Sequence, residues 1–180
     1  NEDNIGVYDT ITSSFSTIDI TGAGVTADYK YYGAAAVGTS VIFAPFNEDN
    51  VGVYDTTTST FSTIDTSGAG VTADYKYSGA VTVGTSVYFT PAGEENVGVY
   101  DTTTSTFSTI DTTAAGVTDE NDKYRGGAAV GTSVVFAPAN EDTVGVLVLP
   151  STSSSAGDDP TFIGADGLPY EVRGEAWKYF

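Results

Sequence analysis

The sequence predicts an all-β protein made of repeated four-stranded antiparallel sheets, and three observations support this fold class. Short runs rich in Val, Ile, Thr, Tyr and Phe lie between clusters of Gly, Pro, Asn, Asp and Ser, which is typical of strands joined by turns. No window shows the apolar spacing of an amphipathic helix. The runs also recur in the same order along most of the chain, which indicates a structural repeat.

The stretch from Tyr77 to Asp111 contains one complete repeat. Gly84-Thr85-Ser86 supplies its first turn, and Pro91 ends its second strand because proline cannot donate a hydrogen bond within a central strand. An acidic loop precedes the third strand, and a short turn separates the third from the fourth. The short connections predict an antiparallel meander with strands at 79–83, 87–90, 97–100 and 106–110.

Aromatic residues set the period of the repeat. Tyr8, Tyr54 and Tyr100 are spaced by 46 residues, as are the phenylalanines at 15, 61 and 107. One extra residue enters the fourth copy within 119–122, a polar connection of the kind that tolerates insertions at a protein surface. Four strands in about 45 residues is the pattern of a β-propeller blade.

The residues of this unit resemble the kelch repeat. The similarity is carried by Lys76-Tyr77-x-Gly79-Ala80-Val81, by Val83-Gly84-x-x-Val87-Tyr88-Phe89, and by Val97-x-Val99-Tyr100-Asp101-x-x-Thr104-x-x-Phe107. It extends over residues 1–149. Thr90-Pro91 replaces the usual Gly-Gly pair and Phe107 replaces the usual Trp. The resemblance therefore implies a divergent kelch-like β-propeller, and such a fold hosts both enzymes and passive binding platforms.

The repeats and the change in composition after residue 149 predict the domain organisation. The chain opens in the middle of a repeat and holds too few blades for a comfortable ring, so we expect either a longer protein or several copies that pair edge to edge. The pattern from Asp159 to Gly174 resembles the start of von Willebrand factor type D and root-cap domains. The predicted segments are a partial blade at 1–19, blades at about 31–65 and 77–111, a partial blade at 124–149, a Ser/Gly/Asp linker at 150–160, and the start of a second β-rich domain at 161–180.

The charge and composition exclude several function classes. Twenty-four acidic and six basic residues give a formal net charge of −18, which disfavours nucleic acid and anionic membrane surfaces as partners. The sequence contains no Cys and no His, so disulfides, thiolate metal sites and imidazole catalysis are excluded within these residues. We expect no membrane insertion, because no apolar stretch is long enough to span a bilayer.

An acidic loop recurs before the third strand of each repeat. Carboxylate oxygens gathered on one face of a propeller are the ligands that calcium prefers, which makes this ion the one candidate cofactor. The spacing matches no dedicated calcium loop, and the alternative is a solvated turn. The candidate metal ligands are Glu48, Asp49, Glu94, Glu95, Glu141 and Asp142.

Each repeat also carries a lysine beside a tyrosine, at Lys30, Lys76 and Lys123. The three lysines are candidates for a ligand rim that binds an anionic sugar. The alternative is that each one pairs with a neighbouring carboxylate, a contact worth about 0 to 1 kcal/mol when exposed.

Two further motifs accompany the third and fourth strands. The aspartates of Tyr-Asp-Thr, at residues 9, 55 and 101, stand where a type I turn favours Asp, and a catalytic role is the alternative. The Thr-rich runs that follow suit the wet face of an outer strand, with ice binding or O-linked sugars as alternatives.

The near-identity of the repeats favours a non-catalytic function. A catalytic site normally makes one blade different from the others. We therefore expect an extracellular or cell-surface scaffold whose propeller contacts proteins, glycans or copies of itself. The alternative is the structural framework of a larger enzyme whose active site lies outside this segment.

Overall fold

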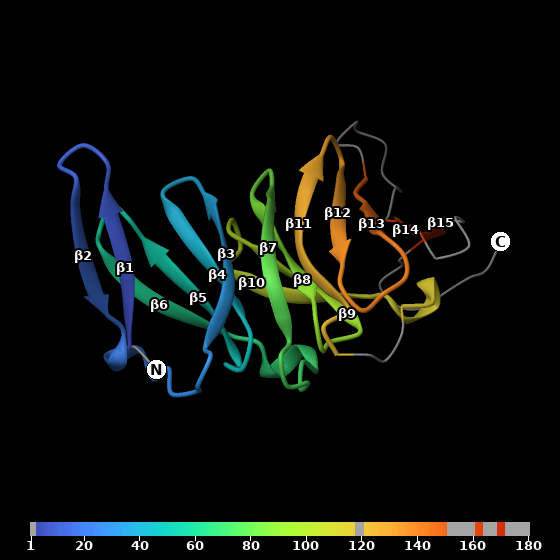
Figure 1. Ribbon diagram of the computed structural model, residues 1–180, viewed down its shortest axis with the longest axis horizontal. Helices are drawn as coiled ribbons and strands as arrows, with labels where there is room; N and C mark the ends of the chain where they lie inside the picture. The colour runs from blue at the N-terminus through green and yellow to red at the C-terminus, as the bar shows by residue number, and fades with distance from the viewer. Residues whose placement is uncertain (1–2, 118–120, 151–160, 164–168, 172–180) are drawn as a thin grey trace.

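The computed structural model describes residues 3–117 and 121–150, and the backbone of two short strands at 161–163 and 169–171 (Figure 1). The described chain is all-β, with single 3-10 turns between sheets, and none of its helices is long and apolar enough to cross a membrane. The strands are β1 (Asn4–Asp9), β2 (Ser14–Asp19), β3 (Tyr31–Val37), β4 (Ser40–Pro45), β5 (Asn50–Asp55), β6 (Thr60–Asp65), β7 (Tyr77–Val83), β8 (Ser86–Pro91), β9 (Asn96–Asp101), β10 (Thr106–Asp111), β11 (Tyr124–Val130), β12 (Ser133–Pro138), β13 (Gly145–Val148), β14 (Thr161–Ile163) and β15 (Pro169–Glu171).

The strands form antiparallel meanders, as the sequence predicted. The orders are β1-β2, β3-β4-β5-β6, β7-β8-β9-β10 and β11-β12-β13-β14-β15. The register repeats with the sequence, because Tyr54 lies opposite Phe61 and Tyr100 lies opposite Phe107. These cross-strand aromatic pairs explain why the aromatic residues keep a fixed spacing.

The sheets stand side by side along the molecule, and their first strands β3, β7 and β11 lie next to one another (Figure 1). Glycine allows this close approach. A Cβ atom built on Gly33 of β3 would lie 2.7 Å from the Cα of Gly79 on β7, and one on Gly79 would lie 2.9 Å from the Cα of Gly126 on β11. The inner strands therefore meet backbone to backbone.

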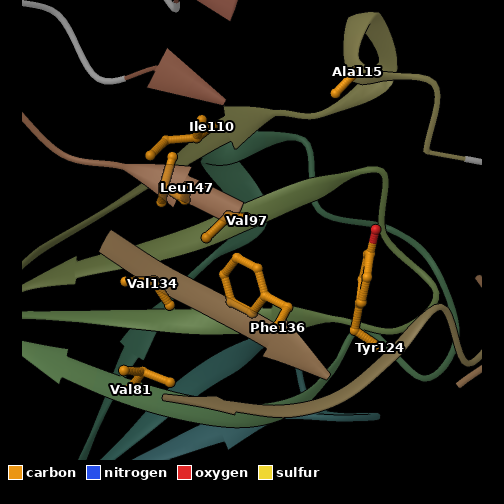
Figure 2. Close-up of a cluster of buried hydrophobic side chains, with 8 residues drawn as sticks. All are labelled: Val81, Val97, Ile110, Ala115, Tyr124, Val134, Phe136 and Leu147. Atoms are coloured by element: carbon orange, nitrogen blue, oxygen red, sulfur yellow. The ribbon is translucent and has the colours of Figure 1, made fainter. Parts of the chain in front are cut away.

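Apolar side chains fill the space between successive sheets. Figure 2 shows the interface of the third and fourth sheets, where Val97, Tyr124, Phe136 and Leu147 are almost completely buried. The preceding interface repeats the arrangement, with Tyr77 and Phe89 packed against residues of β4 and β5. The core is thus a series of layers between blades.

A line of backbone hydrogen bonds also links the blades. The N–H of Lys76 donates to the carbonyl of Phe46 at 2.9 Å, and the N–H of Ala92 donates to the carbonyl of Lys76 at 3.0 Å. The N–H of Lys123 continues the line to Ala92 at 3.2 Å. These bonds satisfy backbone groups where two sheets meet and fix the spacing of the blades.

The fourth sheet acquires its outer strand from residues that the sequence analysis assigned to the start of a second β-rich domain. β14 pairs with β13, with Phe162 opposite Leu147, and so takes the place that β6 and β10 hold in their sheets. β15 then extends the same sheet. Most of the predicted linker and second β-rich domain lies outside the described residues, and those two boundaries stay predictions.

The turn role of the Tyr-Asp-Thr aspartates is confirmed. The Asp55 Oδ1 accepts hydrogen bonds from the N–H and hydroxyl of Thr57, and Asp101 Oδ1 accepts the N–H of Thr103 at 2.8 Å. Hydrogen bonds from these threonines hold the pKa of both partly exposed carboxyl groups below the usual value of 3.8.

These pKa shifts predict the direction of acid destabilisation. A carboxyl group with a lowered folded-state pKa stabilises the fold above its unfolded pKa, and this contribution is lost as the pH falls through the folded pKa. We expect the melting temperature to decrease once the pH drops below 3.8, the usual pKa of these carboxyl groups. The variant D101N should melt below the wild type at neutral pH, and the difference should narrow towards pH 2 in a thermal series followed by circular dichroism. A constant difference would contradict this.

Two buried threonines offer a matched test of hydrogen bonding. Thr90 Oγ1 is buried without a hydrogen-bond partner among the described residues, whereas Thr112 Oγ1 donates to the carbonyl of Glu95 at 2.7 Å. We expect T90V to raise the free energy of unfolding by about 1 kcal/mol and T112V to lower it by a similar amount. Urea unfolding measures the free energy of unfolding of both variants. Equal changes in T90V and T112V would contradict the assignment of a hydrogen bond to Thr112 and none to Thr90.

Candidate functional site

The predicted rim lysines lie between blades. Lys30, Lys76 and Lys123 are all buried, with Lys123 fully enclosed. Lys30 Nζ lies 2.7 Å from Asp3 Oδ1, and Lys76 Nζ lies 3.0 Å from Asp49 Oδ1.

Lys123 Nζ donates instead to the carbonyls of Ala92 and Gly93, at 3.4 and 3.1 Å. Each lysine thus contacts the loop of the preceding blade. These contacts favour an interblade role over either an exposed pair or a ligand rim, and sugar binding by the lysines stays a prediction.

The acidic loops also make structural contacts. Glu94 Oε1 accepts the N–H groups of Thr72 and Ala73, both at 2.7 Å, and Glu48 Oε1 accepts the N–H of Ala27 at 2.6 Å. Both glutamates are buried, Glu95 and Glu141 are partly exposed, and Asp49 and Asp142 are exposed. Within the described residues, no three carboxylates gather closely enough to hold a metal ion.

Chelation tests the calcium hypothesis directly. The carboxylates of Glu48 and Glu94 already accept backbone hydrogen bonds, which satisfy them without an ion. We therefore expect excess EDTA to leave the melting temperature unchanged. A fall that added calcium reverses would instead support a calcium site in these loops.

An aromatic cavity of about 140 Å³ opens where the first strands of three blades meet. Its walls include three aromatic rings, which come from the first of these blades and from its connection to the next. The ring centroid of Phe46 lies 4.9 Å from that of Tyr32 and 5.0 Å from that of Tyr75. Phe46 is buried, whereas Tyr32 and Tyr75 are 58% and 45% exposed, so the two phenols are accessible from solvent. The cavity is lined by Tyr32, Phe46, Tyr75, Ser78, Asp122 and Arg125.

An ion pair supplies the polar part of the cavity. Arg125 Nη2 lies 2.9 Å from Asp122 Oδ2, and both side chains are partly exposed. This hydrogen bond and the negative charge of Asp122 raise the pKa of the Arg125 guanidinium, so the side chain is a permanent cation. One carboxylate uses part of the guanidinium's five donor N–H groups, and a bound group can accept others.

Several residues that line the cavity differ between the repeats. Tyr32 corresponds to Ser78 and Arg125 in the next two copies, while Phe46 corresponds to Ala92 and Ala139. Tyr75 corresponds to Tyr29 and to Asp122, and all three have positive φ angles of 51° to 59°. The backbone is therefore kept while the side chains change. We call the set Tyr32, Phe46, Tyr75, Asp122 and Arg125 the divergent cavity.

Sequence reasoning did not single out the divergent cavity. It selected residues that recur, namely the lysines and the acidic loops, and the lysines contact the preceding blade. The informative positions were those at which the residue varies between copies while its neighbours in the repeat stay the same. Alignment of the repeats shows this variation at Tyr32 and Phe46, but only the fold shows that both line one cavity.

Comparison with known proteins supports the architecture. No family model matches the sequence, and no curated protein resembles it closely enough to count as a relative. Solved structures do match. The virginiamycin B lyase of Staphylococcus aureus has a TM-score of 0.64 and 10% identity, over 97% of this chain and 64% of the lyase. The fold is that of β-propeller blades.

Two other structures give the same result. A chain of a nidogen/laminin complex matches with a TM-score of 0.57 and 10% identity, over 82% of this chain and 52% of that chain. A chain of the hydrazine synthase of Kuenenia stuttgartiensis matches with a TM-score of 0.54 and 15% identity, over 95% of this chain and 43% of that chain. This chain therefore spans less than two thirds of each of these structures, and the identities support a shared fold only.

Proposed function

We propose that this chain is a non-catalytic binding domain that holds a protein partner through the divergent cavity. The observation that carries this proposal is the cavity itself, whose wall combines the accessible rings of Tyr32 and Tyr75 with the Arg125 guanidinium. Tyr32, Phe46 and Arg125 differ from their counterparts in the sister copies, and they meet Tyr75 in a single cavity.

The chemistry of the cavity suits a protein partner. Tyrosine, phenylalanine and arginine are enriched at the centres of protein interfaces, where a few residues supply most of the binding energy. A cavity of about 140 Å³ is large enough for one side chain of a partner. One propeller neighbour belongs to a nidogen/laminin complex, which agrees with protein binding by this fold in general.

The residues of this sequence contain no histidine and therefore offer no imidazole for catalysis. We further propose that the blades are divergent kelch-like repeats and that the protein works outside the cell or at its surface, in keeping with its strongly acidic composition.

Parallel peptide and glycan arrays test the proposal. The full chain would be compared with the double variant Y32S/R125S, in which both positions carry the serine that the middle copy has at Ser78. The control is Tyr29→Ala, because Tyr29 shares the positive φ angle of Tyr75 but does not line the cavity. We expect binding to peptides, a loss of at least about tenfold in the double variant, and no loss in the control.

Other outcomes would contradict the proposal. If Y32S/R125S still bound the peptides, the divergent cavity would not be the peptide-binding site. Glycan signals that disappear in the double variant would assign the cavity to sugars instead of proteins.

A further inference from the structure

The side chains of the divergent cavity indicate which partner groups it accepts, and this inference rests on the function proposed above. The second, third and fourth sheets and their connections line the cavity, and no residue of the first sheet does. The ring plane of Phe46 is tilted by 32° from that of Tyr32 and by 40° from that of Tyr75. An aromatic side chain of a partner can pack against these rings in the offset or edge-on arrangements that aromatic pairs prefer.

The guanidinium of Arg125 has hydrogen-bond donors to spare. It forms one hydrogen bond, from Nη2 to Asp122 Oδ2, and its Nε and Nη1 have no partner among the described residues. The hydroxyl of Ser78, by contrast, already donates to the carbonyl of Tyr124 at 2.6 Å. A guanidinium presents its N–H groups in a fixed fork that matches a carboxylate. The cavity can therefore satisfy a group that only accepts hydrogen bonds.

Arg125 is also the one accessible cation of residues 3–117 and 121–150. The three lysines in these ranges are buried between blades, whereas the Arg125 side chain is 57% exposed. A carboxylate of a partner thus finds a counter-charge at this cavity and at no other place on the described surface.

The net charge of −18 opposes the approach of anions in general. Its influence is screened over about 8 Å at physiological salt, whereas a group in the cavity lies in contact with the guanidinium. A cation held there would be repelled by Arg125 and would have to compete with it for Asp122. The local charge therefore favours one carboxylate, and the long-range charge disfavours a partner segment that carries many.

We propose that the divergent cavity recognises a partner segment with an aromatic side chain and one acidic side chain two positions away. In an extended segment, residues two positions apart point to the same side. The aromatic ring enters the cavity, and the carboxylate accepts the free N–H groups of Arg125 in a charge-assisted hydrogen bond. The rest of the segment is free of acidic residues.

Three blocked peptides that differ at one position measure this preference. They are acetyl-Ser-Gly-Phe-Ser-Glu-Gly-Ser-amide and its counterparts with Gln or Lys in place of Glu, each titrated into the full chain by calorimetry. The blocked ends leave the Glu side chain as the only carboxylate. We expect the Glu peptide to bind at least about tenfold more tightly than the Gln peptide, and the Lys peptide to bind most weakly.

Two variants assign the preference to the ion pair. Arg125→Gln removes the charge and should abolish the difference between the Glu and Gln peptides. Asp122→Asn removes the carboxylate that competes for Arg125, and it should strengthen binding of the Glu peptide by at least about threefold. Asparagine tolerates the positive φ of 59° at this position.

Asp28→Asn is the matched control for the charge. It removes one negative charge from an exposed residue that does not line the cavity, and we expect it to leave the affinity for the Glu peptide unchanged. Circular dichroism establishes that all variants are folded.

Several results would overturn the proposal. They are equal affinity for the Glu and Gln peptides, tighter binding of the Lys peptide, and a D122N variant that fails to strengthen binding of the Glu peptide. A fourth peptide, acetyl-Ser-Gly-Ser-Gly-Phe with a free C-terminus, carries its carboxylate on the main chain. If it bound as tightly as the Glu peptide, the cavity would recognise chain ends instead of acidic side chains.

These failures are distinct from failure of the proposed function. If array peptides bound the full chain and lost binding in Y32S/R125S, while the Glu, Gln and Lys peptides showed no difference, the cavity would bind proteins without a preference for a carboxylate. If no array peptide bound, or if Y32S/R125S bound them all equally well, the proposed function itself would be wrong.

Discussion

Replacement of Gly33 by alanine is expected to lower the free energy of unfolding by about 3 kcal/mol, at the upper end of overpacking effects. The new Cβ would lie 2.7 Å from the Cα of Gly79 and 3.1 Å from the carbonyl oxygen of Ser78. Both contacts are with backbone, so no side-chain rotation can relieve them. The strands β3 and β7 must separate, and this disturbs the interblade core. Urea unfolding followed by circular dichroism measures the loss.

Gly68→Ala is the matched control. Gly68 lies in the 3-10 turn Ser67–Ala69, and a Cβ built on it has no neighbour within 4 Å. The equivalent position in the next copy is Ala114, so alanine is already accepted there. We expect G68A to leave stability within about 0.5 kcal/mol of the wild type. Similar losses in G33A and G68A would show that the effect is not caused by the close approach of β3 and β7.

The strands and their order could be predicted from the sequence because each repeat carries its own local signals. Turn residues such as Gly84 and the β-branched runs between them define short strands, and these signals occur in several copies. The pairing of β14 with β13 could not be predicted in the same way. Phe162 and its neighbours belong to no repeat, and strand partners distant in sequence leave no local pattern.

The functional residues were harder to predict for a physical reason. A recurring charged residue such as Lys76 or Glu94 attracts notice, yet recurrence across blades is what a structural contact between blades requires. The sequence does not show that Lys76 is buried, because burial depends on the angle between neighbouring sheets. The residues of the proposed binding site instead differ between copies, as Tyr32 and Arg125 do.

The ion pair between Lys76 and Asp49 allows the interblade role of the lysines to be tested. The Lys76 side chain is 5% exposed and that of Asp49 is 74% exposed. In an exposed surface pair, loss of either partner costs at most about 1 kcal/mol. In this pair the lysine stem also fills space between two blades, and its amine lies 3.5 Å from the carbonyl oxygen of Asn47. The two partners should therefore differ in their contribution to stability.

We expect Lys76→Ala to lower the free energy of unfolding by roughly 2 to 4 kcal/mol, because it leaves a cavity and removes a buried donor. Asp49→Asn should cost less than about 1 kcal/mol, because the exposed side chain keeps an oxygen acceptor. Chemical unfolding in low and high salt measures both. The cost of K76A should persist in high salt, because packing is not screened as the attraction between charges is. If K76A and D49N instead lowered the free energy of unfolding equally, and high salt removed both losses, the two residues would form an ordinary surface pair. The lysines could then bind the anionic sugar that the sequence suggests.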